Sequence, residues 1–305
     1  MDRSYRWAAV FATILVAGAA APITRVQGVS YTIRGSTHRA RPVPAIPDTG
    51  YTAHVVWATS RGRMDIVSGA QRPLFAEGDY ILFDSTDYIV VHPAAQTYST
   101  PPDMSGMSSA PGMDQMRDAM KVSDIHMSLD TLERGVMING FRTTHYRTRS
   151  SFTITIDMSA FGAAAGSNPP STTTEAVTDI WYADTVAATP SPFVSTAREL
   201  PAMMGAMKEV FDRTKALRAA MPTQLLAVRT TTISRAIPAG SVGPVDGNSE
   251  NAADISDFIR TNVDVSRLAL PASYTLVPMA GTEMFGSPKP LAPEVLAKWR
   301  SVPKE

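Results

Sequence analysis

Within the segment Val136–Asp184, apolar and polar side chains alternate without a break over Phe152–Met158. A period of two is typical of a β-strand with one buried and one solvated face. The turn sequence at Ile138–Phe141 precedes this run, and a further strand-like run, Val177–Tyr182, follows a gap rich in Gly, Ala, Pro, Ser and Thr. The segment is therefore predicted to form consecutive antiparallel strands.

Strand-like patterns also occur on both sides of this segment. A hairpin is predicted at Asp79–His92, where two apolar runs flank the polar turn Asp84–Asp87. Further strands are predicted at residues 29–37, 51–59, 64–67, 225–233 and 267–279. Many strands with few strand–helix–strand alternations predict an α+β protein built on one antiparallel sheet.

One long helix is predicted over residues 201–221, because Pro201 suits a first helical turn and Pro222 ends the pattern. Apolar residues recur there at spacings of three and four and form one stripe, which must be buried. We expect this helix to cover an apolar sheet face, with short helices predicted at 254–262 and 293–300. The stripe consists of Met203, Met204, Met207, Val210, Phe211, Leu217 and Met221.

The first residues predict an export signal. Arg3 and Arg6 carry positive charge, and Trp7–Ala21 is apolar or small except for one threonine. The run is shorter than the roughly 20 residues of a membrane span, so no span is expected after the signal is removed. Cleavage is predicted after Ala19 or Gly28, with Gly28 preferred because a strand pattern starts at residue 29. A periplasmic or secreted protein is expected.

Composition limits the remaining possibilities. The chain has no cysteine, which excludes disulfides, thiolate metal sites and a cysteine nucleophile. Its formal net charge is zero, so nothing favours nucleic acid as a partner. We predict a signal peptide at 1–28 and one domain at 29–280, followed by a Pro-containing tail at 281–305. Within that domain, 103–120 is predicted as a Met-rich loop or lid, and 159–174 as a low-complexity loop.

The layout resembles the LolA/LolB lipoprotein-carrier superfamily, and within it the extracytoplasmic domains of unknown function. The resemblance implies a strongly curved antiparallel sheet, an incomplete barrel, with helices over a hydrophobic cavity that can hold acyl chains. This chain differs in its greater length, Met-rich segment and Pro-rich tail. The residues that carry the resemblance are the export signal and the segments Gly78–Tyr98, Ile138–Tyr146, Ile180–Asp184 and Leu270–Tyr274.

These expectations combine into one functional hypothesis. The chain is predicted to be an exported, non-enzymatic protein that needs no cofactor. It would hold a lipid-like or other apolar ligand, or a lipidated envelope protein partner, between the curved sheet and the helix 201–221. The side chains expected to line this cavity are Trp57, Phe83, Phe152, Ile154, Ile156, Trp181, Met207 and Phe211.

Two other functions are left open. Thioethers suit Cu(I), so the Met-rich segment could bind copper, although methionines equally line adaptable apolar grooves. A hydrolase is also possible, since a catalytic triad can be scattered along the sequence, but no Gly-x-Ser-x-Gly elbow is present. His145, Arg147 and Arg149 share one strand face, which is either merely solvated or a docking patch for an anionic group. The candidate copper ligands are Met104, Met107, Met113 and Met116.

Overall fold

The structure, a computed structural model, describes residues 24–39, 49–70, 75–101, 113–162, 170–190, 205–240, 248–279 and 291–303. These residues form one twelve-stranded sheet with the strand order β12-β6-β5-β4-β3-β2-β1-β11-β10-β9-β8-β7. Neighbouring strands are antiparallel, except that β12 runs parallel to β6. The predicted antiparallel sheet is thus confirmed, and β12 and β7 form its two open edges.

The first strands lie where strands were predicted, and the predicted hairpin is present, with the turn Asp84–Asp87 between β4 and β5. The first half of the sheet comprises β1 Arg25–Arg39, β2 Thr49–Ala58, β3 Arg61–Ala70, β4 Tyr80–Phe83, β5 Tyr88–His92 and β6 Thr97–Ser99. The second half comprises β7 Met120–Ile138, β8 Phe141–Ile156, β9 Ser171–Ala187, β10 Leu225–Pro238, β11 Ser249–Asp264 and the short β12 Thr275–Leu276.

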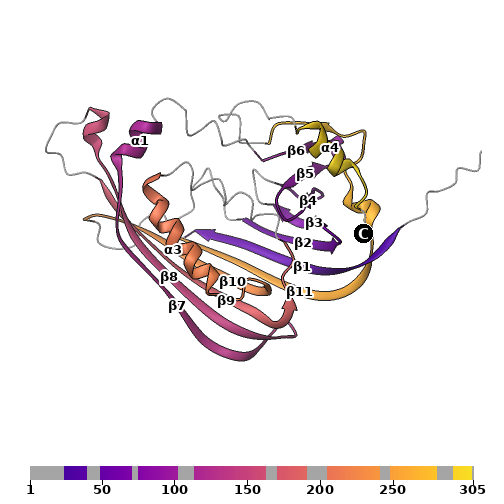
Figure 1. The fold of residues 1–305 in the computed structure, drawn as a ribbon, viewed down its shortest axis with the longest axis horizontal. Coiled ribbons are helices and arrows are strands. Elements are labelled where there is room, and N and C mark those ends of the chain that lie inside the picture. Colours follow the sequence, from indigo (N-terminus) through magenta and orange to yellow (C-terminus); the bar gives the residue numbers. More distant parts are fainter. Residues whose placement is uncertain are drawn as a thin grey trace, which may run out of the picture.

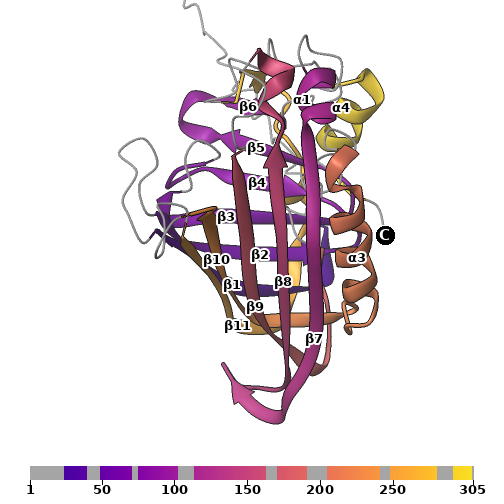
Figure 2. The same cartoon turned by 90° about the vertical axis from the view of Figure 1, so that its left-hand side faces the viewer.

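The sheet is strongly curved, as Figure 1 shows. In Figure 2 the long strands β7, β8 and β9 run across β1–β5 at a steep angle. The strand direction therefore changes strongly from one half of the curved sheet to the other. Irregular pairing adds twist, because an extra residue in one strand bends it locally. Such irregularities occur three times between β7 and β8 and twice between β9 and β10.

The helices of the described residues are short. They are α1 Met113–Ala119, α3 Lys208–Ala219 and α4 Pro293–Arg300, and 3-10 turns occur at Pro93–Ala95, Met158–Phe161, Gly205–Met207 and Val265–Leu268. The prediction of one long amphipathic helix is not confirmed: α3 has twelve residues and buries only Val210, while residues 201–204 lie outside the described residues. None of the described helices has the length and apolar character that crossing a bilayer requires.

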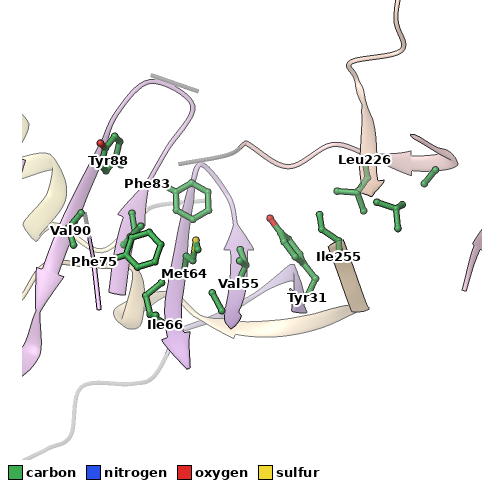
Figure 3. Close-up of a cluster of buried hydrophobic side chains, with 14 of the residues drawn as sticks. Tyr31, Val55, Met64, Ile66, Phe75, Phe83, Tyr88, Val90, Leu226 and Ile255 are labelled. Atoms are coloured by element: carbon green, nitrogen blue, oxygen red, sulfur yellow. The ribbon is translucent and has the colours of Figure 1, made fainter. Parts of the chain in front are cut away.

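The main core lies on one face of the sheet, where side chains from β1–β5 meet residues of β9, β10 and β11. Figure 3 shows Tyr31, Val55, Met64 and Phe83 lying across neighbouring strands of this core. The opposite face of β4 and β5 is also buried, because Trp299 of α4 packs there. Burial on both faces explains the nearly continuous apolar runs of this hairpin.

The most regular alternation builds the least buried part of the sheet. No residue at 146–156 of β8 or at 171–181 of β9 is buried. These strands lie beside the edge strand β7, and α3 contacts that edge through Arg213, which donates to the backbone oxygen of Ile125 at 2.8 Å. The alternating sequence pattern therefore predicted this strand correctly, but it did not predict where in the sheet the core lies.

Three predicted elements are wrong in whole or in part. The strand expected at 267–279 is instead a 3-10 turn at Val265–Leu268 followed by the two-residue β12. The short helix expected at 254–262 is part of β11, where Ile, Thr and Val residues favour a strand. The first strand begins at Arg25 rather than at residue 29, and Val26 is 7% exposed in a small cluster with Val56 and Val263. The rest of the predicted export signal, residues 1–23, lies outside the described residues.

Candidate functional site

A pocket of about 450 Å³ lies where β1 and β2 approach the end of β9. Four apolar side chains from four strands line it, namely Val29, Trp57, Val186 and Phe258. Its volume falls within the range of about 300–1,000 Å³ that is usual for small-molecule sites. We take this pocket as the candidate ligand site.

A local irregularity of β11 brings Phe258 to this pocket. The pairing of β1 with β11 shifts between Ser30 and Thr32, so that Asp257 and Phe258 together oppose Tyr31. Asp257 has a positive φ of 54°, which is a conformation that aspartate tolerates better than most residues. Phe258 then stacks on Tyr31, with 6.0 Å between the ring centroids.

The end of β9 and the residues after it form the opposite wall. The hydroxyls of Tyr31 and Thr189 are 2.9 Å apart, and the backbone N–H of Ala188 donates to Gln224 at 2.8 Å. Burial raises the pKa of Tyr31, and its hydrogen bond to Thr189 offsets this only in part, so the phenol is neutral and available for hydrogen bonding. The wall is thereby tied to β1.

Close backbone packing shapes the floor of the pocket. A Cβ at Gly28 would lie 2.4 Å from the carbonyl oxygen of Trp57 and 2.8 Å from a methyl carbon of Val263. Only glycine fits there without moving β2 or β11, so the position of Trp57 depends on Gly28.

One cation adds polarity to this apolar site. Among the described residues that line the pocket, Arg260 is the only charged one, and its neighbours include the hydroxyl residues Thr59, Thr185 and Thr189. Among the described residues, no carboxylate forms a salt bridge with Arg260. Within the part of the chain that the structure describes, the pocket therefore combines apolar walls with a positive charge that no carboxylate pairs with.

The residues predicted to line a cavity are not gathered at one place. Trp57 lines the pocket and packs against Phe83, with ring centroids 5.6 Å apart. Phe83 is fully buried within the core. Met207 is buried just before α3 and Phe211 is half-buried within it, and neither lines this pocket.

The remaining predicted residues divide between two faces of the sheet. Phe152 pairs with Thr174 and Ile154 with Thr172, and Ile156 shares their parity. Trp181 pairs with His145 and so lies on the opposite face. His145 stacks on the Trp181 ring at 4.0 Å and Arg229 lies over it at 6.0 Å, so side chains from both neighbouring strands cover this ring.

The predicted basic strand face is neutralised by carboxylates. Arg147 makes two hydrogen bonds to Asp179, at 2.7 and 3.0 Å, and His145 Nε2 lies 2.7 Å from the same carboxylate. Burial opposes the ionisation of Asp179, but the hydrogen bonds and charges of Arg147 and His145 outweigh it and lower the pKa of this carboxyl. Arg149 pairs with Asp130. These pairs join neighbouring strands, which accounts for the basic residues without a ligand.

The copper hypothesis is tested only in small part. Met104 and Met107 lie outside the described residues, whereas Met113 and Met116 belong to α1, with Met116 40% exposed. Within the described ranges, no group of three or more His, Asp or Glu residues is arranged to hold a metal ion. A thioether site for Cu(I) stays a prediction.

Sequence reasoning missed most of the pocket. Val29 was expected in a strand, but Phe258 and Arg260 fell in the segment predicted as a helix. The alternation of Ile259, Thr261 and Val263 was the available strand signal. Neither the models of known protein families nor the curated proteins contain a match to this chain.

Proposed function

We propose that this chain is an exported binding protein for a small amphipathic molecule with an apolar body and a negatively charged group. The pocket formed by Val29, Trp57, Val186 and Phe258 is the observation that supports this proposal. The resemblance to the LolA/LolB superfamily favours an acyl chain as the apolar body. The ligand would lie against the ends of β1, β2 and β9, rather than only between the sheet and α3.

The chemistry of the pocket supports an amphipathic ligand over a purely apolar one. Apolar walls favour a hydrocarbon body, because its transfer from water contributes about 25 cal/mol for each Å² buried. Arg260 offers a planar set of N–H donors that matches a carboxylate. A simple fatty acid such as decanoate satisfies both requirements and serves as the probe.

Replacing Val186 with Trp is expected to weaken decanoate binding by about tenfold or more, because the larger side chain fills the pocket. Isothermal titration calorimetry of the folded variant measures this. Val67→Trp is the matched control, since Val67 is 57% exposed and away from the pocket, and should bind as the wild type does. Equal affinities for both variants would rule out this pocket as the ligand site.

The charged group of the ligand can be tested separately. Arg260→Gln should weaken binding of decanoate but leave binding of the uncharged decanol unchanged. If the variant bound neither decanoate nor decanol, the substitution would instead have damaged the apolar walls of the pocket.

Export is expected to remove residues 1–19 rather than 1–28. Cleavage after Gly28 would delete the segment Arg25–Gly28, which pairs with Thr261–Asp264 of β11 and includes the buried Val26. A strand that loses these hydrogen bonds and this apolar contact is destabilised. The intact mass of protein recovered from the cell envelope or medium should therefore correspond to a chain beginning at Ala20. A mature chain beginning at Val29 would contradict this expectation.

A further inference from the structure

Three side chains, one just before β4 and the others on β5 and β6, form a hydrogen-bonded chain outside the pocket. His92 Nδ1 lies 3.0 Å from Asp79 Oδ1, and His92 Nε2 lies 3.3 Å from Ser99 Oγ. Serine, histidine and aspartate in this order match the arrangement that activates a serine nucleophile in unrelated folds. The arrangement is recognised by geometry and not by sequence spacing.

Each member is positioned by the backbone around it. Asp79 directly precedes β4 and closes a turn in which its N–H donates to Ala76 at 3.1 Å. Its Oδ2 accepts the N–H of Ala76 at 2.9 Å, which leaves Oδ1 to His92. Gly78 makes this turn possible with a φ of +87°.

Strand pairing supplies the other two members. His92 ends β5 opposite Thr97, and Ser99 lies two residues further along β6, opposite Val90. Because side chains two residues apart share a face, His92 and Ser99 project to the same side of the sheet. Val90 belongs to the main core cluster on this side, so the surroundings of Ser99 are apolar.

The geometry selects the proton positions that acyl transfer requires. A carboxylate at Nδ1 favours a hydrogen on that nitrogen, which leaves the lone pair of Nε2 facing the Ser99 hydroxyl. His92 can then accept the hydroxyl proton, while Asp79 stabilises the imidazolium that forms. Oriented in this way, the imidazole can act as a general base.

We propose that Ser99 is a nucleophile for acyl transfer, with His92 as its general base and Asp79 as the residue that orients the base. Ser99 Oγ would attack the carbonyl carbon of a carboxylic ester while its proton passes to His92 Nε2. The ester C–O bond then breaks, and the departing alcohol takes that proton. Water hydrolyses the acyl-serine by the same route, with its proton passing to Nε2 and then back to Ser99. This activity goes beyond ligand binding and does not depend on it.

The burial of Ser99 determines the substrate class and the expected rate. Ser99 is fully buried, whereas the side chain of His92 is 28% exposed. Among the described residues, β6 pairs on its outer side only with the two residues of β12, and short edge pairing opens more easily than the centre of a sheet. Esters with an apolar acyl group fit the neighbouring Val90, and local opening is expected to make the reaction slow.

The test uses an alkyl fluorophosphonate, which a serine attacks at phosphorus with loss of fluoride. The full chain is incubated with the reagent, and the peptide containing Ser99 is followed by mass spectrometry. We expect Ser99 to be modified, because His92 can accept the hydroxyl proton as the oxygen attacks phosphorus. Absence of the modification from folded protein after prolonged incubation would overturn the proposal.

Variants separate catalysis from structure. His92→Gln should slow the modification by about a hundredfold or more, which is the usual contribution of a general base. Asp79→Asn should also slow it, because the orientation of the imidazole is lost. Ser85→Ala, in the exposed turn after β4, is the control and should react as the wild type does. If folded His92→Gln reacted at the wild-type rate, the proposal would fail, and circular dichroism verifies the fold of each variant.

Discussion

Replacing Trp299 with alanine is expected to lower the free energy of unfolding by about 3–5 kcal/mol, as is usual when a large buried aromatic residue is truncated. Trp299 is fully buried and packs against Leu82, Val91 and Leu270. The loss would appear in equilibrium unfolding by urea as a lower midpoint. This is the largest stability effect we predict.

The expected loss of stability is large because the Trp299 side chain lies among several contacts between α4 and the rest of the protein. Arg61 is buried against the end of α4, lies over the Trp299 ring and donates to the backbone oxygen of Ser301 at 2.6 Å. Lys298 pairs with Asp84 at 2.5 Å, and Leu270 donates its N–H to the Trp299 carbonyl at 2.8 Å. A cavity at Trp299 would weaken all these contacts together, because they hold one short helix against one face of β4 and β5.

A neighbouring residue serves as the control. Val302 is 44% exposed, so Val302→Ala should change the unfolding free energy by less than about 0.5 kcal/mol. If Trp299→Ala were as stable as Val302→Ala, α4 would not contribute to the stability of the core as inferred here.

Asp179→Asn is expected to cost about 2 kcal/mol at neutral pH, because hydrogen bonds to a charged partner contribute about 1.5–3 kcal/mol. The Asp179 side chain is 16% exposed and accepts hydrogen bonds from both Arg147 and His145. An asparagine in its place leaves Arg147 without its countercharge within the sheet. Thermal or urea unfolding at pH 7 measures the difference.

The same carboxylate predicts how stability depends on pH. The pKa of Asp179 is lowered in the folded protein, since the partners outweigh the effect of burial. Its contribution is therefore complete above the ordinary aspartate pKa of about 3.9 and is lost as the pH falls through the lowered folded value. Asp179→Asn should accordingly lose less stability than the wild type between pH 5 and pH 3.

Asp130→Asn is the matched control, because Asp130 of β7 also pairs with an arginine of β8. Asp130 pairs with Arg149, and both side chains are more than 40% exposed, so this pair should contribute no more than about 1 kcal/mol. If the two variants had equal stability and equal pH dependence, the Asp179 network would not stabilise the sheet in the way proposed.

Local sequence patterns correctly predicted those strands whose structure is specified by residues close together in the sequence. The hairpin Asp79–His92 is an example, because its two apolar runs and polar turn contain all the information that a hairpin needs. The segment 254–262 is the counterexample: its side chains suit a helix or a strand, and pairing with β1 selected the strand.

The candidate sites depended on pairing between distant segments. Asp79, His92 and Ser99 show no motif in the sequence, and only the register of β4, β5 and β6 brings them together. Phe258 reaches the pocket because a shifted pairing turns it toward Tyr31. Parity placed Phe152 and Trp181 on opposite faces, although both are apolar members of regular strands.

By itself, the sequence determined that this chain is mostly antiparallel sheet, because alternation and turn residues act over a few neighbouring positions. Only the tertiary structure decided which alternating strands form the core, where the helices end and which side chains meet. The physical reason is that strand register and curvature arise from contacts between residues far apart in the chain, and a shift of one residue moves every side chain to the other face.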